Sequence, residues 1–161
     1  MLSQYQLKYA EVSVMFYQID ELLKNSEYDI YSNPEVSDEK IKEIAKIISK
    51  NKEIDLKEYF DLLKCSSKFC WLNYLNILEK LPKEDRIRGM PILFELLQDS
   101  NWPTFSKTLE LFEKMDKKVI EPYLNKYMAQ AYDEDDEMWI SNMKLLEKIK
   151  NNRFMGDALV T

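Results

Sequence analysis

The stretch that decides the fold is WLNYLNILEKL, residues 71–81, because its pattern returns twice further along the chain. The matching stretches are WPTFSKTLELF at residues 102–112 and WISNMKLLEKI at residues 139–149. Each begins with tryptophan and carries apolar residues seven and ten positions later, which are Leu78, Leu81, Leu109, Phe112, Leu146 and Ile149. Such self-similarity is typical of stacked helical repeats, in which one unit cannot bury its apolar face alone.

The first two stretches also agree in the residues beyond their ends. A proline comes twenty residues after each tryptophan and a leucine two residues later, at Pro91, Leu93, Pro122 and Leu124. A proline deep inside a helix costs about 3 kcal/mol, so we expect both prolines in a first helical turn or at a kink. The repeat predicts that Trp102, Leu109 and Leu124 lie in one continuous core between adjacent helix pairs.

The composition favours helix almost throughout. The chain has 161 residues, of which 45% are hydrophobic and 32% charged, and only two are glycine. We therefore predict an all-α fold, a short right-handed α-solenoid of HEAT-like antiparallel helix pairs with about seven to eight helices. A single domain is expected, with divergent helices in residues 1–54, repeats in residues 55–150 and a frayed tail in residues 151–161.

Start and stop signals divide the chain into helices. Ser37, Asp55 and Asn101 are the expected N-caps, and Pro103 falls in a first turn, where proline is tolerated. Residues 26–36 form the longest predicted loop, and residues 131–137, which contain five acids, form another. The predicted helices span residues 2–25, 37–50, 55–64, 71–81, 87–97, 101–114, 117–132 and 136–150.

Several kinds of site are excluded by residues that the chain lacks. Without histidine, no Ser-His-Asp or Cys-His arrangement and no imidazole metal centre can form. The chain has only two glycines, far apart, and so lacks a phosphate-binding loop. From these absences together we expect no catalytic residues, no metal and no cofactor. Cys65 and Cys70 are expected as reduced, half-buried thiols. No membrane span or signal peptide is visible, which favours a cytoplasmic location.

Three motifs lie in the second half of the chain: LLQDSNWP at residues 96–103, IEPYL at 120–124 and DDEMW at 135–139. Together they resemble a small bacterial domain family that has a HEAT-like helical-repeat fold and no settled biochemical function. The resemblance covers residues 90–149, and residues 1–60 match no family that we can name. It implies a short helical solenoid encoded near bacterial toxin or immunity genes, and it brings no catalytic residues.

The most concentrated charge lies at residues 133–137, which are all acidic. They form either a solvated loop that favours the start of the last helix or a negative patch that captures a basic partner. A calcium site is a third interpretation, but the glycine and distant glutamate of the helix–loop–helix calcium motif are missing. The candidate partner-binding residues are Asp99, Trp102, Asp133, Glu134, Asp135, Asp136 and Glu137.

Lysines gather around the helix predicted for residues 37–50 and could suggest phosphate contacts: Lys40, Lys42, Lys46, Lys50 and Lys52. Glutamates interleave with them, and a net charge of −6 works against nucleic acid. We expect a solvated helix face there.

We therefore expect a non-catalytic helical-repeat protein-binding module of the bacterial immunity type, with another, basic protein as its partner and no membrane or nucleic acid. It would be a monomer or a weak homodimer. One alternative is a HEAT-like-repeat DNA glycosylase-type enzyme, in which Trp102 with Asp99, or Trp139 with Asp136, would hold a base. The other is a structural subunit that self-associates through its N-terminal helix. The tryptophans are expected in the core, with each indole N–H bonded to a carbonyl, and partial exposure at its turn is left open for Trp102 alone.

Overall fold

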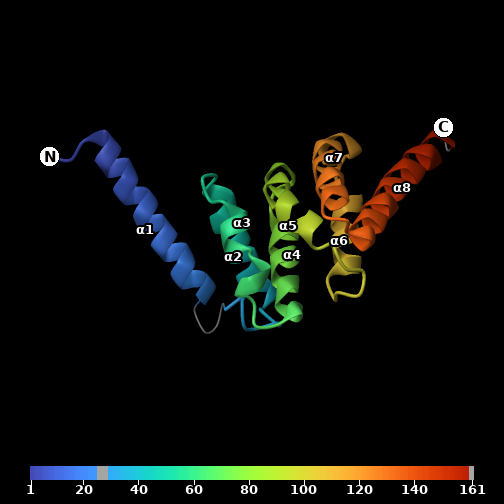
Figure 1. Cartoon of the computed structure of the whole chain (residues 1–161). Coiled ribbons are helices and arrows are strands. Elements are labelled where there is room, and N and C mark those ends of the chain that lie inside the picture. The colour runs from blue at the N-terminus through green and yellow to red at the C-terminus, as the bar shows by residue number, and fades with distance from the viewer. Residues whose placement is uncertain (25–28, 160–161) are drawn as a thin grey trace. The chain divides into compact units, whose positions relative to one another are not determined.

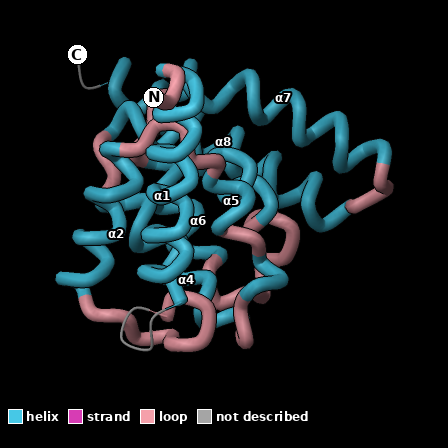
Figure 2. Tube along the Cα trace, turned by 90° about the vertical axis from the view of Figure 1, so that its left-hand side faces the viewer, coloured by secondary structure: helices cyan, strands magenta, loops and turns pink. Residues whose placement is uncertain are grey.

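The computed structural model describes the backbone of residues 1–24 and 29–159, and the side chains of residues 1–10, 19–23 and 29–152. The described residues form helices, turns and loops, without a strand (Figure 1 and Figure 2). The α-helices are α1 (Gln4–Lys24), α2 (Asp38–Lys50), α3 (Leu56–Tyr59), α4 (Trp71–Lys80), α5 (Met90–Glu95), α6 (Phe105–Glu113), α7 (Lys117–Asp133) and α8 (Glu137–Leu159). Three 3-10 helices, η1 (Leu62–Lys64), η2 (Lys68–Cys70) and η3 (Lys83–Gly89), join them. The all-α prediction is confirmed, while the right-handed solenoid stays a prediction.

The chain divides into two compact units, residues 1–85 and residues 86–161. This division falls inside η3. None of the described helices is long and apolar enough to cross a membrane.

In the first unit, α2 begins at its predicted cap. The side chain of Ser37 accepts the backbone N–H of Lys40 at 3.4 Å, and two acids stand in the first turn. The buried face of α2 carries Ile41, Ile44, Ala45 and Ile48. This face packs against α4, whose inner face includes Tyr74, Leu75 and Leu78. The packed pair α2–α4 is the centre of this unit.

The helix predicted for residues 55–64 is divided in two. Asp55 accepts the N–H of Lys57 at 3.0 Å and begins α3 as predicted, but α3 ends at Tyr59. Asp61 then accepts the N–H of Leu63 at 2.9 Å and begins η1. A side-chain acceptor so close to the backbone competes with helical hydrogen bonds, and this second cap ends the helix early.

Asn73 on α4 holds the loop that precedes α2. Its Nδ2 donates to the carbonyls of Ile30 at 2.9 Å and Asn33 at 2.8 Å. The hydroxyl of Tyr31 donates to the carbonyl of Tyr59 at 2.9 Å. These bonds fix residues 29–36 of the predicted loop, and residues 25–28 lie outside the described chain.

In the second unit, α6 begins later than predicted. Asp99 accepts the N–H of Asn101 at 2.8 Å and forms a closed turn, so Asn101 is not the N-cap. The helix begins at Phe105, and the Asn101-Trp102-Pro103 segment precedes it. Thr104 is fully buried, and its carbonyl accepts both the N–H and the hydroxyl of Thr108. The predicted cap at Asn101 and the place of Pro103 in the first turn are therefore wrong.

The core of the second unit is aromatic. The ring of Phe94 lies 4.9 Å from the rings of both Phe112 and Tyr127. Trp139 is 1% exposed, and its indole N–H donates to the carbonyl of Phe94 at 2.9 Å. In the first unit, the indole N–H of Trp71 donates to the carbonyl of Leu62 at 3.0 Å. The predicted core role is confirmed for these two tryptophans.

The predicted core of Trp102, Leu109 and Leu124 is wrong, because all three side chains are only half-buried. Since α6 begins at Phe105, its inner face carries Thr108, Leu111 and Phe112 instead. The buried positions of α7 are Ile120, Tyr127 and Ala131.

The prolines and the last helix differ in part from expectation. Pro91 stands in the first turn of α5 as predicted. Pro122 lies inside α7, beyond its first turn, and the alternative of a kink there stays a prediction. Pro122 is exposed and lacks the N–H that would bond one turn back. Helix α8 continues past the predicted end at Lys150 to Leu159, so the expected frayed tail is helical up to that residue.

Candidate protein-binding surface

The acidic residues 133–137 form the tight junction between α7 and α8. The N–H of Asp136 donates to the carbonyl of Ala131 at 3.0 Å, and that of Asp135 to the carbonyl of Tyr132 at 3.2 Å. Asp135 has a φ of 53°, the left-handed conformation that closes this kind of helix end. Because α7 extends through Asp133, the predicted loop 131–137 is shorter than expected.

Two of the five acids accept local hydrogen bonds: Glu134 from the side-chain amide of Gln130 at 2.9 Å, and Asp136 from the backbone of α8. Asp136 is half-buried, and its Oδ1 accepts the N–H of Trp139 at 3.0 Å, so that it caps the first turn of α8. The side chains of Asp133, Glu134, Asp135 and Glu137 are exposed. Among the described residues, none of the five forms an ion pair with a lysine or arginine. Their charge is therefore directed mainly to solvent.

Apolar side chains stand exposed on both sides of this junction. Tyr132 on α7 is 53% exposed and Met138 on α8 is 44% exposed. Lys144 Nζ lies 6.0 Å from the centre of the Tyr132 ring. We call residues 132–138 the acidic junction. It combines four exposed carboxylates, which form no ion pair with any described residue, with two partly exposed apolar side chains.

Asp99 and Trp102 belong to a different turn, between α5 and α6. Both side chains are half-buried, and the Asp99 carboxylate is bonded to the N–H of Asn101. The seven candidate residues thus fall in two turns. For the base-holding alternative, Trp139 is buried with its indole bonded, and Asp136 caps α8, so that pair offers no exposed ring face in this structure.

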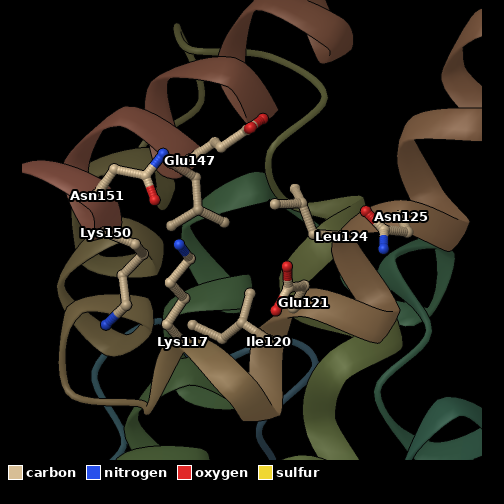
Figure 3. A pocket seen from close by; sticks show the side chains of 9 residues that line it. Lys117, Ile120, Glu121, Leu124, Asn125, Glu147, Lys150 and Asn151 are labelled. Carbon is tan, nitrogen blue, oxygen red and sulfur yellow. The ribbon is translucent and has the colours of Figure 1, made fainter. Parts of the chain in front are cut away.

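A pocket of about 100 Å³ lies between α7 and α8 (Figure 3). It is lined by Lys117, Ile120, Glu121, Leu124, Asn125, Leu146, Glu147, Lys150 and Asn151. This volume is enough for several water molecules. Half-buried Leu124 lines the pocket instead of entering the core.

Lys150, on the wall of this pocket, serves the fold. Its ammonium donates to the carbonyls of Phe112 and Glu113 at 3.1 Å and of Met115 at 2.5 Å. The carbonyls of Phe112 and Glu113 stand at the C-terminal end of α6, where a cation is favoured by the helix dipole, and that of Met115 belongs to the turn that follows. The sequence placed Lys150 at a helix end, but only the packing of α8 on α6 shows which carbonyls it caps.

The two cysteines are free, as expected. Cys65 is half-buried as predicted, whereas Cys70 is fully buried, so the expected half-burial is wrong for Cys70. Cys65 Sγ lies 3.1 Å from the hydroxyl of Tyr74, and burial raises the pKa of Cys65 to about 11. A thiol with this pKa is protonated at neutral pH and weakly nucleophilic. The described residues contain no group of three or more Cys, Asp or Glu side chains placed to hold a metal ion.

No family model, curated protein or solved structure matches this chain. The resemblance over residues 90–149 therefore rests on its three motifs alone and stays a prediction.

Proposed function

We propose that this chain is a non-catalytic protein-binding module whose docking surface is the acidic junction and whose partner is a basic protein. The observation that carries the proposal is the pairing of exposed acids with exposed Tyr132 and Met138. Neither feature serves the core, which is filled by Trp139, Phe94 and their neighbours.

The two features would act at different stages of binding. Exposed carboxylates steer an oppositely charged partner during diffusion and so raise the association rate. Tyrosine and methionine are enriched at protein interfaces, where their burial slows dissociation. The N–H groups of Glu134, Asp135 and Asp136 donate to carbonyls of α7, and the Asp136 carboxylate accepts the N–H of Trp139, so little ordering of the junction backbone is required on binding.

The finer proposal is a cytoplasmic, HEAT-like module of the bacterial immunity type that occludes a toxin domain by surface complementarity. It is supported by the three sequence motifs and by the helical pair α7–α8 that presents the junction.

Matched baits test the proposal. One bait carries Glu134→Gln, Asp135→Asn and Glu137→Gln, which remove three exposed charges and leave the cap Asp136 intact. The control bait carries the same loss of charge at exposed positions of the first unit, as Glu39→Gln, Glu53→Gln and Glu58→Gln.

Quantitative mass spectrometry compares the proteins that the baits retain from cells that co-express a neighbouring toxin gene. The wild-type and control baits should retain equal amounts of a basic protein. The junction variant should retain at least about fivefold less of it. Equal retention on all three baits contradicts the junction as the docking surface.

Self-association is a second candidate, favoured by apolar exposure on α1. Tyr5 is 81% exposed, Leu7 47% and Tyr9 71%. Sedimentation velocity over a concentration series measures it, with Tyr5→Ser/Tyr9→Ser as the comparison. A constant monomer mass for the wild type removes this candidate.

A further inference from the structure

A second, larger hollow lies in the first unit, against α2 and the end of α4. Its volume is about 420 Å³, within the usual range for small-molecule sites. The residues that line it, which we call the lysine groove, are Lys42, Ala45, Lys46, Ser49, Lys50, Lys80 and Pro82. Four of these seven side chains are cationic, and none is acidic.

The helical register brings the cations together. Lys42, Lys46 and Lys50 follow one another at intervals of four residues, so they share one face of α2. They extend over about 12 Å of that helix at 1.5 Å per residue. Lys80 comes from the last turn of α4, which packs against α2.

One carboxylate partly balances this charge from outside the lining. Asp38, in the first turn of α2, lies 2.9 Å from Lys42 Nζ and 3.5 Å from Lys80 Nζ. Among the described residues, Lys46 and Lys50 form no ion pair. The lysine groove therefore keeps an excess of positive charge although the whole chain carries −6.

The remaining polar group of the lining is already engaged. The hydroxyl of Ser49 donates to the buried carboxylate of Asp85 at 3.0 Å, and Lys52 binds the same carboxylate. Lys52 is thus directed to a structural partner and is not part of the groove. The four ammonium groups are therefore the polar groups of the lining that can bind a ligand. Ala45, Pro82 and the lysine stems form the apolar surroundings.

We propose that the lysine groove binds a compact anion that carries two or more phosphate groups, free or as a lipid headgroup. Lysine ammonium groups are point charges that suit phosphate oxygens, and several of them can share one polyphosphate. No aromatic side chain lines the groove, so nothing there stacks on a base. The acidic whole-chain charge also disfavours an extended nucleic acid.

Titration calorimetry with sodium tripolyphosphate at low salt tests the proposal on the full chain. Lys46→Gln/Lys50→Gln should weaken binding at least about tenfold, because two charge-assisted contacts are lost. The matched control Lys57→Gln/Lys118→Gln removes two exposed charges elsewhere and should change affinity less than about twofold. Asp38→Asn should tighten binding several-fold, because it releases Lys42 and Lys80 from their present partner.

The vesicle arm separates the two sources of phosphate. Flotation with phosphatidylcholine vesicles, with and without phosphatidylinositol bisphosphate, supports a lipid source if only the phosphorylated vesicles retain the chain through Lys46 and Lys50. Tripolyphosphate binding without vesicle binding supports a free ligand.

Three results overturn the proposal: no binding of tripolyphosphate by the wild type, equal loss in the control variant, or tighter lysine-dependent binding of a single-stranded oligonucleotide. Circular dichroism checks the fold of each variant. If Lys46→Gln/Lys50→Gln is unfolded, Lys46→Arg/Lys50→Arg replaces it. That variant must retain binding, since it keeps both charges.

Discussion

Replacing Lys150 of α8 by methionine removes the ammonium group that caps the C-terminal end of α6. The side chain is 9% exposed, and its ammonium donates to three backbone carbonyls, of Phe112, Glu113 and Met115. Methionine keeps an unbranched apolar stem of similar length, so the change isolates the loss of the ammonium group.

The expected cost is set by these contacts. A hydrogen bond to a charged group contributes about 1.5–3 kcal/mol. The Phe112 carbonyl keeps the N–H of Met115 as a donor, so the desolvation penalty falls on the carbonyls of Glu113 and Met115. Against this stands the cost of burying the ammonium, which the variant no longer bears. We expect Lys150→Met to lower the free energy of unfolding by about 3 kcal/mol, a large part of the ~5–15 kcal/mol typical of a domain.

Urea unfolding followed by circular dichroism measures the change. The matched control is Lys148→Met, an exposed position two residues away on the same helix, which should change stability by less than about 0.5 kcal/mol. If the two variants are equally stable, the capping role of Lys150 is refuted.

The other predictions concern single side chains. Asp135→Gly should raise the free energy of unfolding by about 0.5–1 kcal/mol in urea, because glycine adopts the left-handed φ of 53° without cost, and a loss would contradict this reasoning. Leu124→Ala should cost about 1 kcal/mol in the same assay, below the ~2–5 kcal/mol of a core leucine, because Leu124 is half-buried. Burial raises the pKa of Cys65 to about 11, so the unfolded chain loses the thiol proton at a lower pH than the folded chain does. The free energy of unfolding should therefore fall as pH rises from about 8.5 to about 11. The urea midpoint of Cys65→Ser should fall less than that of the wild type over the same pH range.

The sequence predicted the features that depend on neighbouring residues. Ser37 and Asp55 begin their helices as expected, since a cap needs only a side-chain acceptor and an N–H two or three positions away. The same local rule explains one error, because Asp61 supplies a further cap inside a stretch of unbroken helical periodicity. The helical periodicity predicted one helix over residues 55–64, without a cap at Asp61.

The repeat gave wrong predictions where residues at equal spacing lie in different structural surroundings. Trp71 and Trp139 lie in helices with their indoles bonded to carbonyls, whereas Trp102 lies in a turn held by Asp99. That turn moves the start of α6, so Leu109 leaves the core face. Three tryptophans at similar offsets therefore have two different roles.

The candidate sites show the same division between local and distant information. Charge density alone located the acidic residues 133–137, but no sequence pattern indicated that Tyr132 and Met138 would be exposed beside them. The lysine groove needs Lys80 from another helix, about thirty residues beyond Lys50 in sequence. Such pairings come from tertiary packing, which one sequence does not encode in its spacing.

Hydrogen–deuterium exchange tests the central claim, docking at the acidic junction, most directly. The chain is measured alone and in complex with the basic partner captured by the matched baits, with peptides that cover both units. We predict slower exchange at residues 130–140 in the complex, and no such change when Glu134→Gln/Asp135→Asn/Glu137→Gln replaces the wild type. Protection confined to the first unit, or unchanged by the variant, would contradict docking at the acidic junction.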